Sequence, residues 1–236
     1  MNKYELVELF ADGADIEQIK TLASFDWIKG FTTNPTLMRK AGVDNYLDFA
    51  LETLSVIGDR PLSLEVFATE FADMERQAGV LAELGANVNV KIPITNTKGE
   101  FCGETVRNLL SKGVAVNVTA IMTCDQLDRL CEFLVPGPGV FISVFAGRIA
   151  DTGVDPIPTI TRAVEICGER ANTKVIWASP RELLNVVQAA GSGCHILTAT
   201  PDILNKIELI GKDLAEFSLE TVKMFENDAL AASYKV

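Results

Sequence analysis

The feature that most constrains the fold is a regular alternation of short apolar runs with amphipathic segments along the 236 residues. The runs are rich in Val, Ile, Leu and Phe, which is typical of buried strands. They comprise residues 7–11, 28–32, 62–67, 88–92, 114–119, 140–145, 174–178 and 195–198. Eight strands that alternate with helices predict a single closed parallel (β/α)8 TIM barrel of the α/β class. An open doubly wound sheet is the main alternative, but it normally has fewer strands.

The segments between the runs have apolar residues three and four positions apart, as in helices that cover a sheet. Thr123 is a typical helix N-cap, and Ser179 followed by Pro180 also indicates a helix N-terminus. Gly113 lies where a helix should end. The clearest helical segments are residues 45–57, 71–84, 124–134 and 180–190.

The C-terminal part of the chain is longer than one barrel unit requires. Residues 202–210 can form the last barrel helix, which predicts a catalytic barrel over residues 1–211. Residues 212–236 then form an extension with an amphipathic helix over 212–227. Its apolar face requires a partner, either the barrel of the same chain or a neighbouring subunit.

Composition excludes several classes of partner. The net charge of −11 argues against general binding of nucleic acid or anionic membranes, although a local basic pocket can still bind a phosphorylated substrate. No apolar run approaches the length of a membrane span, and the first residues do not resemble a signal peptide. Five scattered cysteines without a C-x-x-C motif indicate reduced thiols in a cytoplasmic protein. The single histidine, His195, cannot support a multi-histidine metal site, and we interpret it as a packed strand residue.

Lys91 is the most unusual residue in the predicted strands. It interrupts the run Val88-Asn-Val-Lys-Ile92, and burying an ammonium there is costly unless it is paired or its pKa is lowered. A desolvated lysine is the usual source of a Schiff-base nucleophile. The alternative is an edge-strand lysine whose amine reaches solvent.

Further polar residues lie at the C-terminal ends of the predicted strands, where the chemistry of such barrels collects. Strict alternation within strands directs Glu65, Lys91 and Thr119 into one barrel interior, where mutual pairing would be the least costly arrangement. A purely structural polar network is the alternative, but it gives no reason for these residues to concentrate at one end of the strands. The remaining strand-end candidates are Asp12, Thr32, Asn34, Asn117, Ser143 and Phe145.

Three residues after the sixth and seventh strands suggest an anion pocket. Arg148 and Arg181 supply guanidiniums, Ser179 supplies a hydroxyl, and the predicted helix N-terminus at Pro180 supplies backbone N–H groups. Each arginine could instead form a surface ion pair. Their shared position near the last strands favours a phosphate monoester.

Four ordered motifs resemble those of the transaldolase family, especially its short members, which include the fructose-6-phosphate aldolases. The motifs are Phe31-Thr-Thr-Asn-Pro-Thr36, Val90-Lys-Ile-Pro-Ile-Thr95, Gly147-Arg-Ile-Ala-Asp151 and Ala178-Ser-Pro-Arg181. The resemblance spans essentially the whole chain. It implies a (β/α)8 barrel and class I aldolase chemistry, without a cofactor or metal, on sugar-phosphate substrates.

The resemblance also implies roles for individual residues. Lys91 matches the Schiff-base lysine, and Glu65 and Thr119 match the pair that holds a catalytic water. Asp12 matches the aspartate that moves the proton of the hydroxyl beside the broken bond, although Asp15 is an alternative because this first strand departs from the family pattern. Asn34 matches a donor-binding asparagine. The matches to the phosphate site are Arg148, Ser179 and Arg181, and Ser143 matches a substrate contact.

Two positions favour transaldolase within this family. Transaldolases are similar to this chain in having glutamate and phenylalanine where it has Glu65 and Phe145, whereas the fructose-6-phosphate aldolases have glutamine and tyrosine. Pro180 stands where an aromatic residue is common. We therefore expect transfer of a dihydroxyacetone unit in the pentose phosphate pathway, with release of free dihydroxyacetone or non-catalytic sugar-phosphate binding as alternatives. The resemblance also implies a homo-oligomer, a pentamer or decamer assembled through the C-terminal helix.

Overall fold

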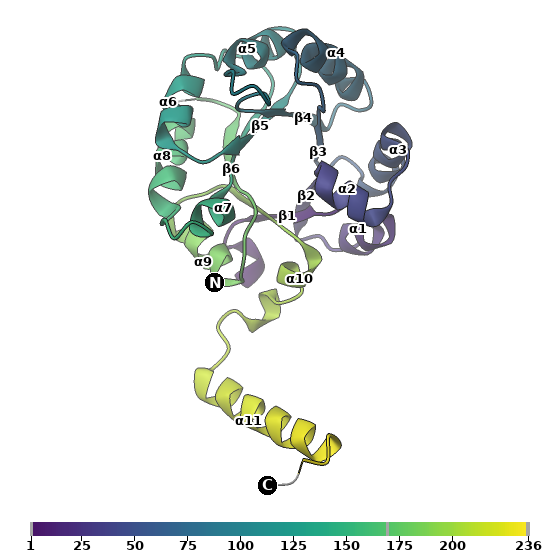
Figure 1. The fold of residues 1–236 in the computed structure, drawn as a ribbon. Coiled ribbons are helices and arrows are strands. Elements are labelled where there is room, and N and C mark those ends of the chain that lie inside the picture. Colours follow the sequence, from purple (N-terminus) through teal and green to yellow (C-terminus); the bar gives the residue numbers. More distant parts are fainter. Residues whose placement is uncertain (1, 169, 235–236) are drawn as a thin grey trace.

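Eight parallel strands close into a barrel in the order β1 to β8, with helices around it (Figure 1). The computed structural model describes residues 2–168 and 170–234. The predicted (β/α)8 barrel is therefore confirmed. The strands are β1 (Glu8–Asp12), β2 (Ile28–Thr32), β3 (Leu62–Glu65), β4 (Val88–Pro93), β5 (Val116–Ile121), β6 (Val140–Val144), β7 (Thr173–Trp177) and β8 (Ile196–Ala199).

Helices follow the strands, and several of them begin at a residue whose side chain caps the helix N-terminus. Thr123 forms a capping box with Gln126, as its position before an apolar segment predicts. The helices are α1 (Ile16–Ala23), α2 (Pro35–Ala41), α3 (Tyr46–Ile57), α4 (Phe71–Ala82), α5 (Gly103–Ser111), α6 (Cys124–Cys131), α7 (Ala146–Ala150), α8 (Ile157–Gly168), α9 (Leu184–Gly191), α10 (Pro201–Leu204) and α11 (Leu214–Ala231), with 3₁₀ turns at Lys3–Glu5 and Ile207–Leu209.

Strand register brings the predicted polar residues side by side. Glu65 on β3 pairs with Lys91 on β4, and Lys91 pairs in turn with Asn117 on β5. Because the barrel is closed, β4 has a neighbour on both sides. The interpretation of Lys91 as an edge-strand residue is therefore wrong.

Apolar side chains fill one part of the barrel interior. Phe10, Phe141, Ile176 and Ile196 form a buried cluster separate from the larger core between the strands and helices. The rings of Phe10 and Phe141 meet edge to face, with centroids 5.9 Å apart. Gly30 makes room for this packing, because a Cβ there would lie 2.5 Å from the Phe10 ring. The polar side chains of the interior therefore lie outside this apolar cluster.

A β-bulge shapes the rim of the barrel at β5. The pairing with β6 runs from Val118 opposite Ile142 to Ile121 opposite Val144, so β5 contains one extra residue. Ala120 accommodates this bulge with φ +62°, a left-handed conformation that is rare for a residue with a Cβ. The bulge lies directly after Thr119, whose side chain faces the cavity.

The segment after β7 differs from the sequence prediction. Helix α9 begins at Leu184, not at Pro180. Asn185 accounts for the difference, because its side-chain oxygen accepts hydrogen bonds from the backbone N–H groups of Arg181 and Glu182. Ser179 adopts φ +59° at the start of this irregular segment.

Helix α11 extends away from the barrel (Figure 1). None of its residues is buried, and Leu214, Val222 and Phe225 expose 80%, 60% and 62% of their surface. The expectation that this apolar face packs on the barrel of its own chain is therefore wrong for this structure. Within the described residues, no helix combines the length and hydrophobicity needed to cross a bilayer.

Candidate active site

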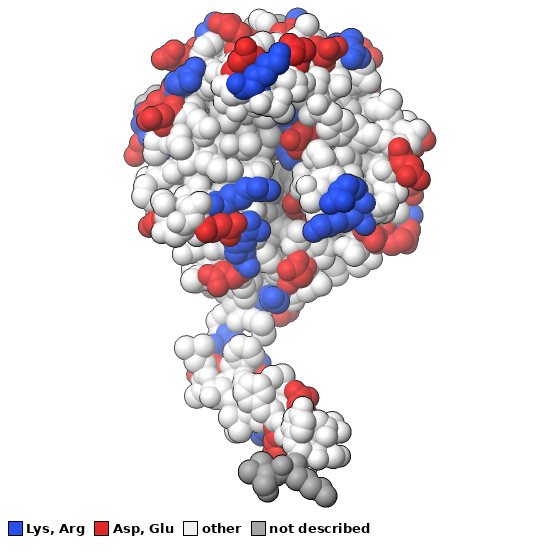
Figure 2. Space-filling model, in the orientation of Figure 1, with Lys and Arg blue, Asp and Glu red and all other residues white. Residues whose placement is uncertain are grey.

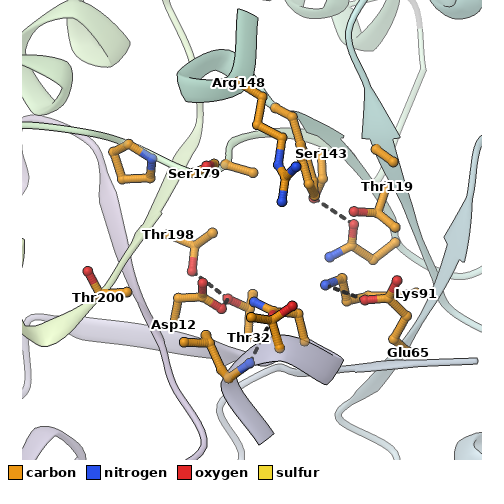
Figure 3. A pocket seen from close by; sticks show the side chains of 18 of the residues that line it. Asp12, Thr32, Glu65, Lys91, Thr119, Ser143, Arg148, Ser179, Thr198 and Thr200 are labelled. Carbon is orange, nitrogen blue, oxygen red and sulfur yellow. Dashed lines mark hydrogen bonds and ion pairs between the residues drawn. The ribbon is translucent and has the colours of Figure 1, made fainter. Parts of the chain in front are cut away.

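A cavity of about 520 Å³ opens at the C-terminal ends of the strands, within the usual size range of small-molecule sites. All twelve residues proposed from the sequence line it, with side chains converging from several strands (Figure 3). They are Asp12, Thr32, Asn34, Glu65, Lys91, Asn117, Thr119, Ser143, Phe145, Arg148, Ser179 and Arg181.

Lys91 lies at the buried end of the cavity in an ion pair. Its Nζ is 2.9 Å from Glu65 Oε2, and it donates a hydrogen bond of 2.9 Å to the backbone carbonyl of Thr33. The Lys91 and Glu65 side chains are 7% and 20% exposed. Glu65 offsets the desolvation of the ammonium and is also positioned to accept its proton. This geometry can deliver a neutral amine to a carbonyl carbon in the cavity.

Asp12 lies across the cavity floor from Lys91 (Figure 3). Burial raises the pKa of the Asp12 carboxyl, while the Lys91 charge and a hydrogen bond from Thr32 oppose that effect. Thr32 Oγ1 is 2.8 Å from Asp12 Oδ1. A carboxyl with a raised pKa is suited to exchanging a proton with a substrate hydroxyl near neutral pH.

The structure decides between the two aspartates near the first strand. Asp15 is the N-cap of α1, and its side chain accepts hydrogen bonds from the backbone N–H groups of Glu17 and Gln18. Asp12 ends β1 and lines the cavity. Asp12 is therefore the residue available for chemistry.

Two buried hydroxyls near Lys91 have no hydrogen-bond partner among the described residues. They are Thr119 Oγ1, which lines the cavity, and Thr33 Oγ1, next to the carbonyl that holds Lys91. Unsatisfied buried polar atoms are uncommon in folded proteins and call for a water or a ligand. Thr119 Oγ1 is therefore without a partner among the described residues, in the same cavity as the Lys91–Glu65 pair.

A hydrogen-bonded chain crosses the interior beside Lys91. Asn117 donates to Ser63 Oγ at 3.0 Å, and Ser143 donates to Asn117 Oδ1 at 2.7 Å. All three side chains are buried. These bonds link β3, β5 and β6 and restrict the orientations of the polar groups that face the cavity.

The opposite end of the cavity is basic and more exposed. Figure 2 shows basic side chains on the α7 and α9 side of the central hollow, and Figure 3 shows Arg148 reaching toward the cavity. Arg148 has no ion-pair partner among the described residues. Its guanidinium carbon Cζ lies 5.8 Å from the centroid of the Phe145 ring. Arg181 forms a bidentate pair with Asp151, in which Nε donates to Oδ1 at 3.0 Å and Nη2 donates to Oδ2 at 2.5 Å.

Close backbone packing determines the shape of this basic end. A Cβ at Gly147 would lie 1.6 Å from the carbonyl oxygen of Ser179, so a glycine is required there. The predicted helix N-terminus at Pro180 is wrong, because α9 begins at Leu184 and Asn185 already accepts from two of the backbone N–H groups. The backbone N–H groups of Arg181 and Glu182 are therefore not available to an anion.

Asn34 and His195 form hydrogen bonds with the backbone. Asn34 is the N-cap of α2, accepting from the N–H of Leu37 at 3.0 Å while lining the cavity. His195 Nδ1 accepts from the N–H of Val175 at 3.0 Å and does not line the cavity. Burial lowers the pKa of His195. Its interpretation as a packed residue agrees with these contacts.

Sequence reasoning missed several cavity residues. Thr198 on β8, with Thr200 and Asp202 just beyond it, lines the cavity. Thr198 ends the last apolar run, and Thr200 and Asp202 follow it as Asp12 and Asn34 follow earlier runs, so the strand-end criterion could have identified them. Ala120 was not identifiable in this way, because its role depends on the bulge.

Comparisons with known proteins identify the family of this chain. Residues 9–235 match the model of the family described as Transaldolase/Fructose-6-phosphate aldolase. A protein named "Probable transaldolase" from Methanococcus maripaludis is 35% identical over 204 residues, which are 85% of this chain and 89% of that protein. Another of the same name from Bartonella henselae is 31% identical over 227 residues, 94% of this chain and 100% of that protein.

A comparison with solved structures independently supports the barrel. A mutant tryptophan synthase alpha-subunit from Pyrococcus furiosus superposes with a TM-score of 0.58 at 14% identity. The superposition covers 89% of this chain and 93% of that chain. At this identity the likeness concerns the fold alone.

Proposed function

The chain belongs to the transaldolase/fructose-6-phosphate aldolase family, and we propose that it is a transaldolase that works through a Schiff base on Lys91. Its activity is of the aldolase or transaldolase type. The proposed reaction moves a dihydroxyacetone unit from a ketose phosphate, such as fructose 6-phosphate or sedoheptulose 7-phosphate, to an aldose phosphate. The observation that supports it most directly is the buried Lys91–Glu65 pair, 2.9 Å apart, beside Asp12 and a cavity.

The first half-reaction begins with the amine of Lys91. Glu65 accepts an ammonium proton and the free amine attacks the C2 carbonyl of the ketose. Glu65 then returns the proton to the carbinolamine hydroxyl, which leaves as water and gives an iminium. Thr119, whose hydroxyl has no partner among the described residues, is available to hold that water. Asp12 then accepts the C4 hydroxyl proton while the C3–C4 bond breaks. The electron pair of that bond moves to the iminium and forms an enamine, and an aldose leaves.

The second half-reaction reverses these steps with a different aldose. The enamine carbon attacks the acceptor aldehyde, Asp12 returns its proton to the new hydroxyl, and hydrolysis of the iminium frees Lys91. Arg148, Ser179 and Arg181 are proposed to bind the phosphate, and Asn34 and Ser143 the hydroxyls of the donor. Buried electrostatics and proton transfer by a positioned carboxyl are each large contributors to catalysis of this kind.

Borohydride trapping tests the covalent mechanism. The protein is incubated with fructose 6-phosphate and borohydride, and its peptides are mapped by mass spectrometry. A reduced adduct on Lys91 is the expected result, and none should form in the Lys91→Met variant. Binding of the sugar phosphate without an adduct on Lys91 would refute the mechanism and favour a non-catalytic binding protein.

Product analysis separates transfer from simple cleavage. With fructose 6-phosphate alone, a transaldolase keeps the three-carbon unit bound, whereas an aldolase releases free dihydroxyacetone. Adding erythrose 4-phosphate should therefore start turnover and yield a seven-carbon ketose phosphate. Steady release of dihydroxyacetone without an acceptor would identify a fructose-6-phosphate aldolase instead.

We also propose that α11 joins copies of this chain into a homo-oligomer, a pentamer or a decamer. The apolar side chains of α11 do not pack on their own barrel, and the outer surfaces of α3 and α4 expose Leu47, Leu51 and Val80. A second copy with the same exposed residues is a matching partner for both surfaces. Light scattering on a chain ended after Gly211 should show a monomer, and an unchanged mass would contradict this proposal.

A cytoplasmic location is part of the same proposal. All five cysteines are free thiols, and three of them are buried. Burial raises the pKa of Cys102 to about 11, so this thiol stays protonated and unreactive at neutral pH. A chain with these unpaired thiols suits a reducing compartment.

A further inference from the structure

Three neighbouring strands place three hydrogen-bonding side chains in a row at the cavity floor. Thr198 is on β8, Asp12 on β1 and Thr32 on β2. Thr32 Oγ1 is 2.6 Å from Thr198 Oγ1 and 2.8 Å from Asp12 Oδ1, so Thr32 links the other two (Figure 3). Thr198 and Thr32 are only 5% and 4% exposed.

Proton counting relates the direction of this chain to the charge on Asp12. A carboxylate only accepts hydrogen bonds, so an ionised Asp12 requires the single Thr32 proton. Thr198 must then donate to Thr32. When Asp12 is protonated, it can donate to Thr32, and Thr32 can donate to Thr198. Both hydrogen bonds in this chain can therefore reverse their donor and acceptor when Asp12 gains or loses a proton.

Among the described residues, hydrogen bonds connect Thr198 to Asp12 only through Thr32. Of the described side chains, only Thr32 forms a hydrogen bond with Thr198 Oγ1. When Thr198 donates a hydrogen bond to Thr32 Oγ1, it polarises the Thr32 hydroxyl. The hydrogen bond that Thr32 donates to the Asp12 carboxylate then becomes stronger. That stronger bond favours ionised Asp12 and opposes the effect of burial. It also fixes the rotamer of Thr32.

We propose that Thr198 is a positioning residue for carbon–carbon bond cleavage, because its hydroxyl orients Thr32 as a donor to Asp12. The inference rests on the proposed function, in which Asp12 must be ionised to accept the C4 hydroxyl proton. A purely structural pair of threonines would support packing but would not affect the protonation of Asp12. The two roles therefore differ in their pH dependence.

Thr198→Val tests the proposal by removing the hydroxyl while preserving the shape of the side chain. The acid limb of the pH profile for donor cleavage should move to higher pH, because less Asp12 is ionised at a given acidic pH. At the acidic end, kcat should fall by roughly 3- to 10-fold, with KM and the yield of the trapped Lys91 adduct unchanged. Thr198→Ser retains the hydroxyl and should restore the parent profile.

Thr53→Val is the matched control. Thr53 is a fully buried threonine on α3 whose hydroxyl has no partner among the described residues. Its replacement removes the same group without touching the cavity and should leave the profile unchanged. A Thr198→Val profile that coincides with the parent, or a Thr198→Ser variant that does not restore it, would overturn the proposal.

A second measurement separates this inference from the proposed function. The Asp12 carboxyl can be titrated by carbon-13 NMR in the ligand-free protein, without any assay of turnover. The pKa of Asp12 should rise in Thr198→Val and remain unchanged in Thr53→Val, whether or not Lys91 forms an adduct. An unchanged Asp12 pKa in Thr198→Val would refute the role of Thr198 even in an active transaldolase. Thr198→Cys, a weaker donor of similar size, replaces the valine variant if that variant does not fold.

Discussion

The two ends of the cavity use charge differently. At the inner end, the Lys91–Glu65 pair is 7% and 20% exposed, and Asp12 lies nearby on the same floor. At the outer end, Arg181 and Asp151 are each 50% exposed, and Arg148 is exposed without an ion-pair partner among the described residues. Charge interactions are strong where water is excluded and weaker where it is present. The inner end is therefore suited to bond making and breaking, and the outer end to recognising a charged group.

The largest expected effect is at Lys91. Lys91→Met removes the nucleophile, so activity should fall by roughly 10⁴-fold or more. The variant also leaves Glu65 without its cation, which should cost about 3 kcal/mol of stability. Denaturant unfolding and a coupled transfer assay measure the two effects. The variant Lys112→Met, which breaks a more exposed pair with Glu75, should retain activity and lose less than about 1 kcal/mol.

A double substitution separates catalysis from pairing at the inner end. Lys91→Met combined with Glu65→Gln removes both charges and should recover most of the lost stability without recovering activity. Return of activity would show that Lys91 is only a structural cation. Stability that remains as low as in the single variant would show that the ion pair is not the cause of the loss.

Asp12 should show opposite effects on activity and stability. Asp12→Asn should lower kcat by roughly 10²- to 10⁴-fold, because the proton acceptor is lost. Burial raises the pKa of Asp12 in the folded protein above its ordinary 3.8. Ionisation of Asp12 therefore costs stability, and this cost grows as pH rises above 3.8 and is complete above the folded-state pKa. Asp12→Asn should therefore raise Tm by ~1–3 °C at neutral pH. The gain should shrink as pH falls through the folded-state pKa and disappear below 3.8; equal gains at all pH values would contradict this account.

At the outer end, Arg148→Ala should affect binding more than chemistry. Loss of one charge-assisted contact predicts a KM for fructose 6-phosphate that is roughly 10- to 100-fold higher, with kcat changed by only a few-fold. Arg162→Ala removes a surface arginine of α8 that pairs with Asp128 and Glu165, and should leave both constants unchanged. A loss confined to kcat in Arg148→Ala would mean that the outer end also takes part in the chemical steps.

The smallest effect is expected at Asp151. Its carboxylate pairs with the guanidinium of Arg181 and would compete there with a phosphate in the proposed site. Asp151→Asn should therefore strengthen inhibition by inorganic phosphate by roughly 2- to 5-fold at low ionic strength, and less at high salt. Weaker inhibition would indicate that Asp151 holds Arg181 in the orientation needed for binding.

Much of the inner end could be predicted from the sequence. The alternation of strand residues directs Glu65 and Lys91 to the same face, and their pairing needs only the in-register contact of consecutive strands. The strand-end position of Thr198 was visible in the sequence, but its link to Asp12 was not, because that link depends on side-chain contacts between strands that barrel closure brings together. A residue 186 positions from Asp12 in the chain cannot be recognised as its indirect neighbour from local patterns.

The outer end was predicted less well. Arg148, Ser179 and Arg181 do line the cavity, but the helix N-terminus expected at Pro180 is absent. The Ser179-Pro180 pair is a valid local helix signal, yet Asn185 and the close approach of Gly147 impose a different backbone. The pairing of Arg181 with Asp151 was also outside the reach of sequence analysis, because a long, exposed side chain has many alternative partners.

The sequence alone determined the barrel, the polar strand ends and the inward-facing position of Lys91, because hydrophobic periodicity and strand alternation are local properties of the chain. Tertiary structure decided the matters that depend on contacts distant in sequence. It selected Asp12 over Asp15, left Thr119 without a partner beside the β5 bulge, and linked Thr198 to Asp12 through Thr32. It also left the apolar face of α11 uncovered, because none of the described barrel residues packs over it.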